Sequence, residues 1–557
     1  MTYRSLFGKG FWLLALLLIL AVAVAGCGGT ADEPADEPAD EPADEPADEP
    51  ADEPADEGPK DLTIGYYREF TILDPHMSSA GLDSLGLRAI FDRLVEVNST
   101  EGGEIFPALA TDWSISDDGT VTTFNLRDDV TFHDGTPFNA EAVKFNFDRI
   151  VDPATASQSA VFGMGPYVET RVVDDYTVEV VHDYPYGPFI RTISAASYGM
   201  VSPAAVEELG DDFAQRPVGS GPFKFVEWVG GSHVTLEKNE DYTPVVSFNA
   251  DEAYYETVTF RFIEENSTRA AALQTGETDA ASNMAANDFV RLRDSGNFET
   301  HVFTTLGGPP AGLQVNVSNP PTDDILVRRA IIHQVDSELV REVVYEGIPD
   351  PSGGILSRHD FYYNPEAGEM YDYGNTEKAA ELLDEAGWLM EDDGKRYKDG
   401  QMLEIKYLTL PGVRNVAEVV EPMLSDMGAD VEIWALDNPM QQNTAQEGEH
   451  NLVWTQWSSN DPSAIRGRFH SENIGSGWNF YHYSNPEVDE LFEQGERTAD
   501  VDERKEIYDR IQYILMEDGL MVPLNNVAIM WAFRPEIKGW TPADSTGWFG
   551  FVLNLHE

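Results

Sequence analysis

A run of Ala-Asp-Glu-Pro repeats over residues 31–57 divides the chain into a short N-terminal segment and about 500 further residues. The repeats contain no side chain larger than proline or glutamate, so burial of apolar surface cannot offset the entropy lost on ordering. Their like charges and regularly spaced prolines favour an extended backbone close to polyproline II. We therefore expect an acidic linker over residues 27–60 and a folded part that begins only after it.

The segment before this linker has the pattern of a secretory signal. Arg4 and Lys9 give a basic start, and the uninterrupted apolar run over residues 11–24 is short for a transmembrane span. Small residues lead to Cys27, the only cysteine, which cannot form an internal disulfide. The segment resembles the lipobox of bacterial lipoproteins, which implies a signal peptide over residues 1–26 and a lipid on Cys27 at the extracytoplasmic face of the cell membrane. The alternative is an ordinary cleaved signal followed by an unrelated cysteine.

The formal net charge of −63 argues against one large class of partners. After the linker, 34 lysine and arginine residues stand against 85 aspartate and glutamate residues, spread along the chain. A surface of this sign repels nucleic acid, so no nucleic-acid partner is expected. No second apolar run reaches the length of a membrane span. We therefore expect the folded part to lie outside the cytoplasm.

About 500 residues exceed what one hydrophobic core supports, so two or more lobes are expected. Alternating runs of β-branched and aromatic residues predict strands, and amphipathic runs with capping residues predict helices. The predicted strands include residues 61–67, 120–127, 176–182 and 256–263. The predicted helix N-caps include Asn139, Thr376 and Asn485, with Pro486 in the first helical position of the last helix. This mixture indicates an α/β fold.

One segment, residues 109–145, is more specific than any periodicity. It reads LATDWSISDDGTVTTFNLRDDVTFHDGTPFNAEAVKF, with turn dipeptides at Asp118-Gly119 and Asp134-Gly135. We interpret His133 as a histidine hydrogen-bonded within its own hairpin, not as a catalytic or metal-binding group. The segment closely resembles the signature region of family 5 extracellular solute-binding proteins, the receptors of ABC importers for oligopeptides, dipeptides and nickel.

The resemblance continues in order through later segments and covers roughly residues 61–540. It implies an α/β, two-lobed, periplasmic-binding-protein-like clamp of type II with an extra domain. The implied parts are lobe I over residues 61–105, 218–310 and 525–557, the extra domain over 106–217, and lobe II over 311–524. Crossings near residues 313–316 and 522–525 would act as hinges, so that the lobes close on a solute and exclude water.

The same resemblance implies a receptor that performs no chemistry. It would capture a small polar solute, with a peptide as the leading expectation, and deliver it to an ABC permease in the membrane with its ATPase. A monomer without a cofactor is expected. A surface hydrolase is an alternative from another class, although the chain has no Gly-x-Ser-x-Gly or His-Glu-x-x-His motif. A sensor or chaperone that uses the same clamp without transport is a further alternative.

The resemblance places ligand contacts in the segment over residues 451–470. In peptide-binding members a carboxylate four residues before a proline holds the α-ammonium group of the ligand. Here Ser458 stands four residues before Pro462, which puts binding through a free N-terminus in doubt unless Asp461 turns inward. The predicted ligand-binding residues are Trp454, Trp457, Asn460, Asp461, Arg466 and, at the end of the first strand, Tyr66.

Each of these residues also has a structural interpretation. Trp454 and Trp457 lie three residues apart and cannot share one face of a strand, so either can belong to the core. Asp461 can cap the turn that follows it. Arg466 and Arg468 can pair with nearby acids instead of a ligand carboxylate. Aromatic faces suit a peptide, a sugar or a planar chelate alike.

Nickel or a metal chelate is the alternative ligand within the same family. The nearby histidines are His450, His470 and His482. Their wide spacing matches no metal-ligand motif, and no cysteine lies near them. We therefore expect no metal site built from protein side chains, although the family often carries metal as a small-molecule chelate, for which one histidine could suffice.

Overall fold

The structure is a computed structural model that describes residues 60–78, 81–98, 104–246, 252–304, 307–457, 459, 461–540 and 552–557. The chain divides into two compact units, Met1–Glu57 and Gly58–Glu557, and all described residues belong to the second. The predicted signal peptide and Cys27 lie outside the described residues. Within the described ranges, no helix is both long and apolar enough to cross a membrane.

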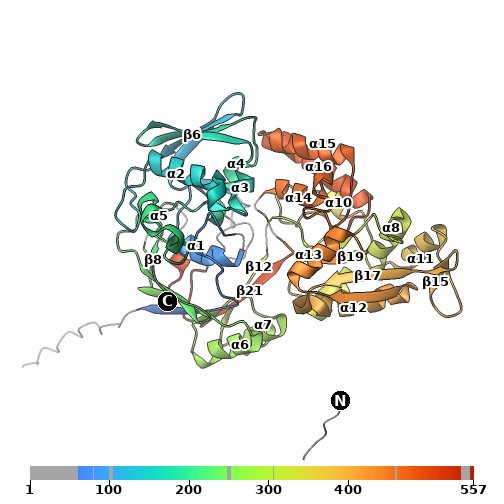
Figure 1. The fold of residues 1–557 in the computed structure, drawn as a ribbon. Helices are drawn as coiled ribbons and strands as arrows, with labels where there is room; N and C mark the ends of the chain where they lie inside the picture. Colours follow the sequence, from blue (N-terminus) through green and yellow to red (C-terminus); the bar gives the residue numbers. More distant parts are fainter. Residues whose placement is uncertain are drawn as a thin grey trace, which may run out of the picture. The chain divides into compact units, whose positions relative to one another are not determined.

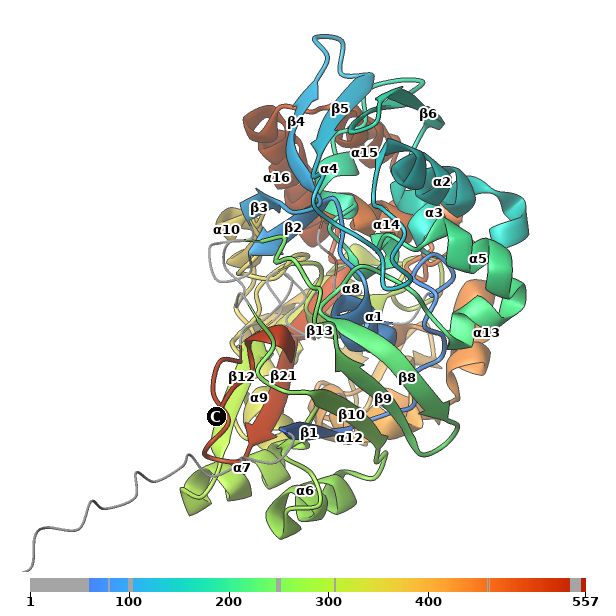
Figure 2. The same ribbon diagram turned by 90° about the vertical axis from the view of Figure 1, so that its left-hand side faces the viewer.

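Three distant stretches of the chain combine in a seven-stranded mixed sheet (Figures 1 and 2). β1 (Asp61–Tyr66) buries Leu62, Ile64 and Tyr66, the alternation that a strand with a core-facing side requires. β1 runs parallel to its neighbours β10 and β11, and the other neighbouring strands are antiparallel. The order is β12 (Glu299–Thr304), β21 (Ala528–Phe533), β11 (Ala280–Ala281), β1, β10 (Thr257–Phe262), β9 (His233–Lys238) and β8 (Phe223–Val229).

A four-stranded antiparallel sheet lies above the seven-stranded sheet in the view of Figure 2. α2 (Ala140–Val151) packs on it and buries Val143, Phe147 and Ile150 along one side. Asn139 is the N-cap of α2, as predicted, and its side chain accepts the Ala142 N–H at 3.0 Å. The strand order is β4 (Ala110–Ile115), β5 (Val121–Leu126), β7 (Thr177–His182) and β6 (Tyr167–Asp174). The short strands β2 (Val95–Asn98) and β3 (Glu104–Pro107) pair separately.

His133 is hydrogen-bonded, but the expectation that its partners lie within its own hairpin is wrong. Its Nδ1 accepts the N–H of Gly219 at 3.3 Å, and its Nε2 donates to the carbonyl of Gly221 at 2.9 Å. Both partners lie more than 80 residues further along the chain. Burial lowers the pKa of the imidazole to about 4. The side chain therefore ties the hairpin, as a neutral group, to the turn that precedes β8.

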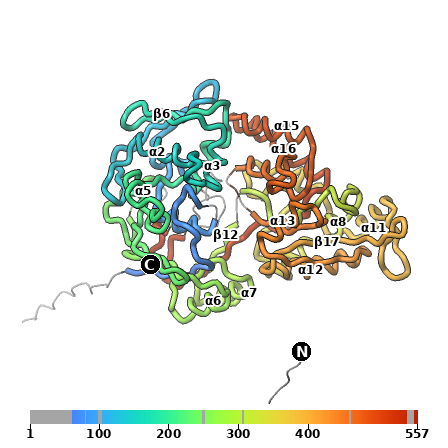
Figure 3. The backbone as a smooth tube through the Cα atoms, viewed as in Figure 1, coloured from blue at the N-terminus to red at the C-terminus, as the bar shows by residue number. Residues whose placement is uncertain are grey.

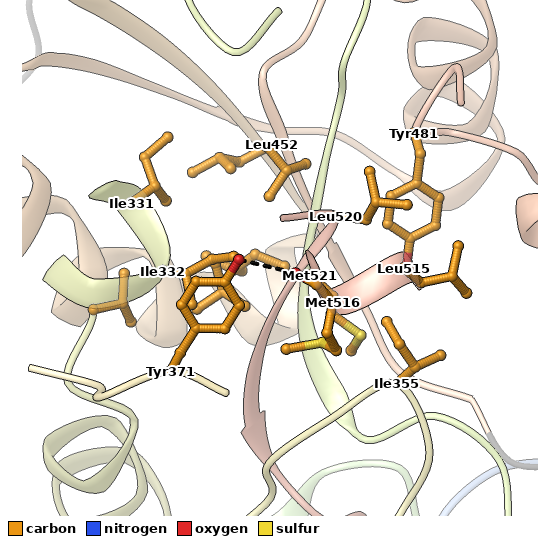
Figure 4. Close-up of a cluster of buried hydrophobic side chains, with 14 of the residues drawn as sticks. Ile331, Ile332, Ile355, Tyr371, Leu452, Tyr481, Leu515, Met516, Leu520 and Met521 are labelled. Carbon is orange, nitrogen blue, oxygen red and sulfur yellow. Dashed lines mark hydrogen bonds between the residues drawn. The ribbon is translucent and has the colours of Figure 1, made fainter. Parts of the chain in front are cut away.

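A five-stranded sheet forms the centre of the right-hand body in Figure 1. Its order is β18 (Asp430–Ala435), β17 (Glu404–Thr409), β19 (Leu452–Thr455), β13 (Ala311–Val315) and β20 (Met521–Asn525). The helices around it include α8 (Ile325–Gln334), α9 (Ser337–Tyr345), α11 (Thr376–Glu385), α12 (Arg414–Asp426), α13 (Asn438–Glu447), α15 (Pro486–Arg497) and α16 (Val501–Glu517). Figure 4 shows Leu515 and Met516 of α16 beside Met521 of β20 in the core. There the Tyr371 hydroxyl donates to the Met516 carbonyl at 2.9 Å.

The predicted helix starts in this body are partly confirmed. Asn485 caps α15 by accepting the Glu487 N–H at 3.0 Å, and Pro486 is the first helical residue. The prediction for Thr376 is wrong by one position, because Asn375 is the cap and accepts the Lys378 N–H at 3.0 Å. Two adjacent residues of capping type leave the choice to the backbone geometry before the helix.

Two neighbouring strands connect the bodies. β13 follows β12 of the seven-stranded sheet, and β20 leads directly back to β21 of that sheet. β13 and β20 pair antiparallel, with Leu313 opposite Val522. Both crossings therefore lie side by side at the positions where hinge strands were predicted. Their action as hinges stays a prediction.

Candidate ligand-binding site

A cavity of about 1210 Å³ opens among three stretches of the chain. The first stretch is residues 67–87, which follow β1; the second is residues 158–197, which follow α2; and the third is residues 457–496, which follow β19. Its volume exceeds the range of about 300–1,000 Å³ that is common for small-molecule sites. The cavity therefore has room for a short peptide or a chelate together with ordered water.

Aromatic side chains from all three stretches line this cavity. They are Tyr67, Phe162, Tyr186, Trp457 and Trp478. Phe162 is 77% exposed and Trp478 is 47% exposed, so both rings are open to solvent at the cavity. Such faces pack on apolar parts of a ligand and attract cations.

Asp461 belongs to the cavity wall but is already paired. Its carboxylate accepts two hydrogen bonds from Arg504 of α16, at 2.6 and 2.8 Å, and a third from the Ser463 N–H at 2.9 Å. Burial acts to raise the pKa of Asp461, but the charge and hydrogen bonds of Arg504 hold it below its ordinary value. Asp461 therefore caps the following turn and anchors α16.

Arg466 lies between two carboxylates of the same wall. Its Nη1 donates to Glu472, and its Nε lies 3.6 Å from a carboxylate oxygen of Glu496. The hydrogen bond from Arg466 lowers the pKa of Glu472, whereas burial raises the pKa of Glu496. The cavity therefore contains a charged cluster in which Arg466 donates a hydrogen bond to Glu472 but not to Glu496.

Arg468 holds the two tryptophans of the wall. Its guanidinium carbon lies 4.3 Å from the ring centre of Trp457 and 5.4 Å from that of Trp478. Burial lowers the pKa of Arg468 to about 10, and no described carboxylate lies within ion-pair distance of it. The alternative in which Arg468 serves a local acid therefore does not apply within the described residues. Its cation–π contacts keep the Trp457 ring in place beside the cavity.

The predicted site residues divide into two groups. Trp457, Asp461 and Arg466 line the cavity together. Trp454 is buried in the core around β19. Tyr66 is fully buried as well, and its hydroxyl donates a hydrogen bond to the Leu82 carbonyl at 2.6 Å. Asn460 lies outside the described residues, as does Ser458. The cavity is reached instead by Tyr67, the residue after Tyr66, because neighbouring residues of an extended chain point to opposite sides.

Several lining residues had no signal in the sequence. Phe162 and Tyr186 come from the stretch between β5 and β8, and Glu496 comes from the last turn of α15. Each is separated from residues 451–470 by other elements of the chain. Only the tertiary fold brings these residues to the cavity, so residues 451–470 alone give no indication of them.

The three histidines near the predicted segment do not form a metal site. The Nε2 atoms of His450 and His482 bond to the carbonyls of Phe480 (3.0 Å) and Ala445 (2.9 Å), and His470 caps a turn at Glu472. None of the three lines the cavity. Among the described residues, no group of three or more His, Cys, Asp or Glu side chains is arranged to hold a metal ion.

Beside the cavity, next to its lining residues Tyr186 and Glu496, two distant segments meet in what we call the rim contact. The Gly187 N–H donates to the Glu496 carbonyl at 2.8 Å, and the Arg497 guanidinium lies 5.0 Å from the Tyr184 ring centre. A Cβ atom at Gly187 would overlap the Thr498 carbonyl oxygen. Figure 3 shows α15 on the side of the right-hand body that faces the left-hand body. The turn at Gly187 therefore rests directly on the end of α15.

Comparisons with known proteins agree with this architecture. Residues 104–475 match the family model described as "Bacterial extracellular solute-binding proteins, family 5 Middle". Glutathione-binding protein GsiB of Escherichia coli (strain K12) is 26% identical over 502 residues, which cover 88% of this chain and 93% of GsiB. The structure of NikA from Brucella suis in complex with Fe(III)-EDTA superposes with a TM-score of 0.80 at 25% identity, covering 89% of this chain and 99% of NikA.

The protein DppA from Helicobacter pylori, in complex with the peptide STSA, superposes with a TM-score of 0.72 at 26% identity. The match covers 90% of this chain and 98% of DppA. These likenesses confirm the predicted α/β periplasmic-binding-protein fold. The chain therefore belongs to the family 5 bacterial extracellular solute-binding proteins, the non-enzymatic receptors that bind a solute for an ABC transporter.

Proposed function

We propose that the protein is a lipid-anchored receptor that captures a short peptide in the cavity and delivers it to an ABC import permease. The observation that carries the proposal is the cavity of about 1210 Å³, whose wall combines aromatic faces with a charged cluster. A peptide presents both apolar side chains and charged groups, so this wall matches its chemistry. The names of GsiB and of DppA with its bound peptide support a peptide-like solute.

The proposed mechanism is closure of two lobes about the crossings β13 and β20. Lobe I would comprise residues 61–105, 218–310 and 525–557, with the extra domain over 106–217, and lobe II would comprise 311–524. The separate sheets and cores of these stretches support this division. Closure brings residues 158–197 against residues 457–496 and removes the solute from water, which strengthens its polar contacts.

A thermal-shift titration with defined solutes tests the proposed function. The panel contains the tetrapeptide Ser-Thr-Ser-Ala, glutathione, a neutral sugar and Ni(L-His). A solute that binds only the folded protein raises the free energy of unfolding by about 2.7 kcal/mol at a concentration of 100 Kd. We expect a peptide of this panel to raise the melting temperature. A shift with the nickel complex alone would favour the metal-chelate alternative, and no shift with any solute would contradict the receptor proposal for these classes.

The lipid anchor is a separate part of the proposal and has its own test. Cys27 follows a signal-like segment and is the only cysteine in the chain. We expect Cys27→Ser to move the protein from the membrane fraction to the soluble fraction of cells that express the full chain. Thr30→Ser is the matched control, because it changes a hydroxyl residue three positions away and leaves the cysteine in place. Membrane retention of the Cys27→Ser protein would refute the anchor.

A further inference from the structure

The charged side chains on the cavity wall do not balance. Four of them line the cavity: Asp461, Arg466, Glu472 and Glu496. Asp461 is neutralised from behind by Arg504, through two hydrogen bonds of 2.6 and 2.8 Å. Arg466, the one cation among the described lining side chains, therefore faces two carboxylates, whereas Arg468 lies behind Trp457 and Trp478 and pairs with neither.

Glu496 is the less well satisfied of these two carboxylates. The Arg466 Nη1 donates a hydrogen bond to Glu472, whereas its Nε lies 3.6 Å from Glu496, beyond hydrogen-bond distance. Among the described residues, no group donates a hydrogen bond to the Glu496 carboxylate. The side chain is only 24% exposed, so water replaces these missing bonds incompletely. Burial raises the pKa of Glu496, with Arg466 opposing.

An aromatic ring beside this carboxylate also favours a positive charge. The carbonyl groups in the last turn of α15 (Pro486–Arg497) add nothing, because those of Gln494, Gly495 and Glu496 already accept hydrogen bonds from Thr498, Arg504 and Gly187. The Tyr186 ring lines the same cavity, and the pKa of its phenol is raised by burial and then by the charge of Glu496. A cation in the cavity would therefore meet a carboxylate and an aromatic ring.

We propose that Glu496 binds a positively charged amino group of the ligand. The inference rests on the proposed function and narrows it to solutes with a free ammonium group. The carboxylate comes from the last turn of α15, and not from the segment before Pro462, where the family resemblance places it. Since the Glu496 carbonyl also accepts the Gly187 N–H, the same residue takes part in ligand binding and in the rim contact.

The first experiment compares two forms of one peptide with the unmodified protein. Isothermal titration calorimetry at pH 7 measures the affinity for Ser-Thr-Ser-Ala and for its N-acetylated form. Acetylation removes the charge and adds only a small group. Loss of a charge-assisted hydrogen bond in a partly buried site predicts binding of the acetylated peptide that is weaker by about tenfold or more. Equal affinities would overturn the inference.

The second experiment tests whether Glu496 causes the preference for the free peptide over its N-acetylated form. Glu496→Gln keeps the size of the side chain and removes its charge. We expect this variant to lose the preference for the free peptide and to bind the two forms within about twofold. Glu493→Gln is the control, because Glu493 lies on the same helix, is half-exposed and is absent from the cavity wall; it should keep the full preference. Melting temperatures without peptide establish that both variants are folded.

The outcomes separate this inference from the proposed function. If the unmodified protein binds the free peptide and Glu496→Gln keeps the preference, the peptide receptor stands and the assignment to Glu496 is wrong. If only Ni(L-His) binds and Glu496→Gln binds it equally well, the assignment is also wrong. If no peptide binds at all, the proposed function fails and the inference fails with it.

Discussion

Asp461 and Arg504 show how one buried pair links the cavity wall to the core. Their side chains are 5% and 4% exposed, and two hydrogen bonds join them. Removing one member leaves the other charge buried without its partner, which typically costs about 3–5 kcal/mol. We expect Asp461→Asn to lower the free energy of unfolding by about 3 kcal/mol, measured by urea denaturation.

Asp509→Asn is the control for this prediction. Asp509 pairs with Lys505 at 3.1 Å on the outer side of the same helix, α16, and both side chains are partly exposed. Exposed pairs of this kind contribute about 0.3–0.5 kcal/mol. Similar urea midpoints for the two variants would contradict a special contribution of the Asp461–Arg504 pair.

His133 gives a pH dependence with a defined sign. Its pKa falls to about 4 on folding because the ring is buried, whereas an exposed histidine has a pKa of about 6.5. The unfolded chain therefore binds a proton that the folded protein rejects, and stability from this residue is lost as the pH falls from about 6.5 to 4. In this window the slope reaches about 1.4 kcal/mol per pH unit for one proton.

Urea denaturation at pH 7.0, 5.5 and 4.5 measures this slope. We expect the His133→Gln variant to lose less stability between pH 7.0 and 4.5 than the unmodified protein does. The comparison cancels the contributions of the other titrating groups. Parallel pH profiles for the two proteins would contradict the prediction, because they would mean that the pKa of His133 is the same in the folded and unfolded states.

Part of the site could be predicted at the level of residues. Trp457, Asp461 and Arg466 belong to one continuous segment, and a family resemblance marks such a segment. Glu496 and Tyr186 could not be predicted, because more than 300 residues separate them and only the fold brings both to one wall. The environment of Asp461 was also out of reach, since its partner Arg504 is 43 positions away.

At the level of elements, alternation and capping residues predicted where strands and helices lie, but not the order of the strands in the sheets. The predicted strands over residues 61–67, 120–127, 176–182 and 256–263 are confirmed as β1, β5, β7 and β10, within one residue at each end. In β7, Val178 and Val180 are buried, in the period of two that marks a strand. Strands of two residues, such as β11, carry too few positions for any period to be visible.

The N-cap of α2 gives a prediction at this scale. The Asn139 side chain accepts the Ala142 N–H, which has no partner within the helix. We expect Asn139→Ala to lower the free energy of unfolding by about 1 kcal/mol, measured by urea denaturation. Ser159→Ala is the control, because Ser159 precedes α3 (Ala160–Gly163) and makes no capping side-chain hydrogen bond. An equal effect of both substitutions would mean that the cap bond adds nothing.

At the scale of the whole molecule, the two bodies are joined on one side and touch on another. The chain crosses between them at β13 and β20, and the turn at Gly187 rests on the end of α15. The cavity lies among the segments between these two places. If the two bodies close on a ligand as proposed, we expect this contact to stabilise the closed form and its loss to lower the fraction of molecules in that form.

Gly187 tests this view because it has no room for a side chain. A Cβ atom there would overlap the Thr498 carbonyl oxygen, while the backbone hydrogen bond to Glu496 fixes the turn in place. We expect Gly187→Ala to weaken affinity for the best peptide ligand about tenfold, since overpacking costs about 1–3 kcal/mol and apparent affinity falls with the closed fraction. Small-angle scattering should show a smaller decrease in the radius of gyration on adding peptide. Gly412→Ala is the control, because the position has open space around it, and it should change neither the peptide affinity nor the decrease in the radius of gyration. If Gly187→Ala leaves the peptide affinity unchanged, the rim contact plays no part in closure.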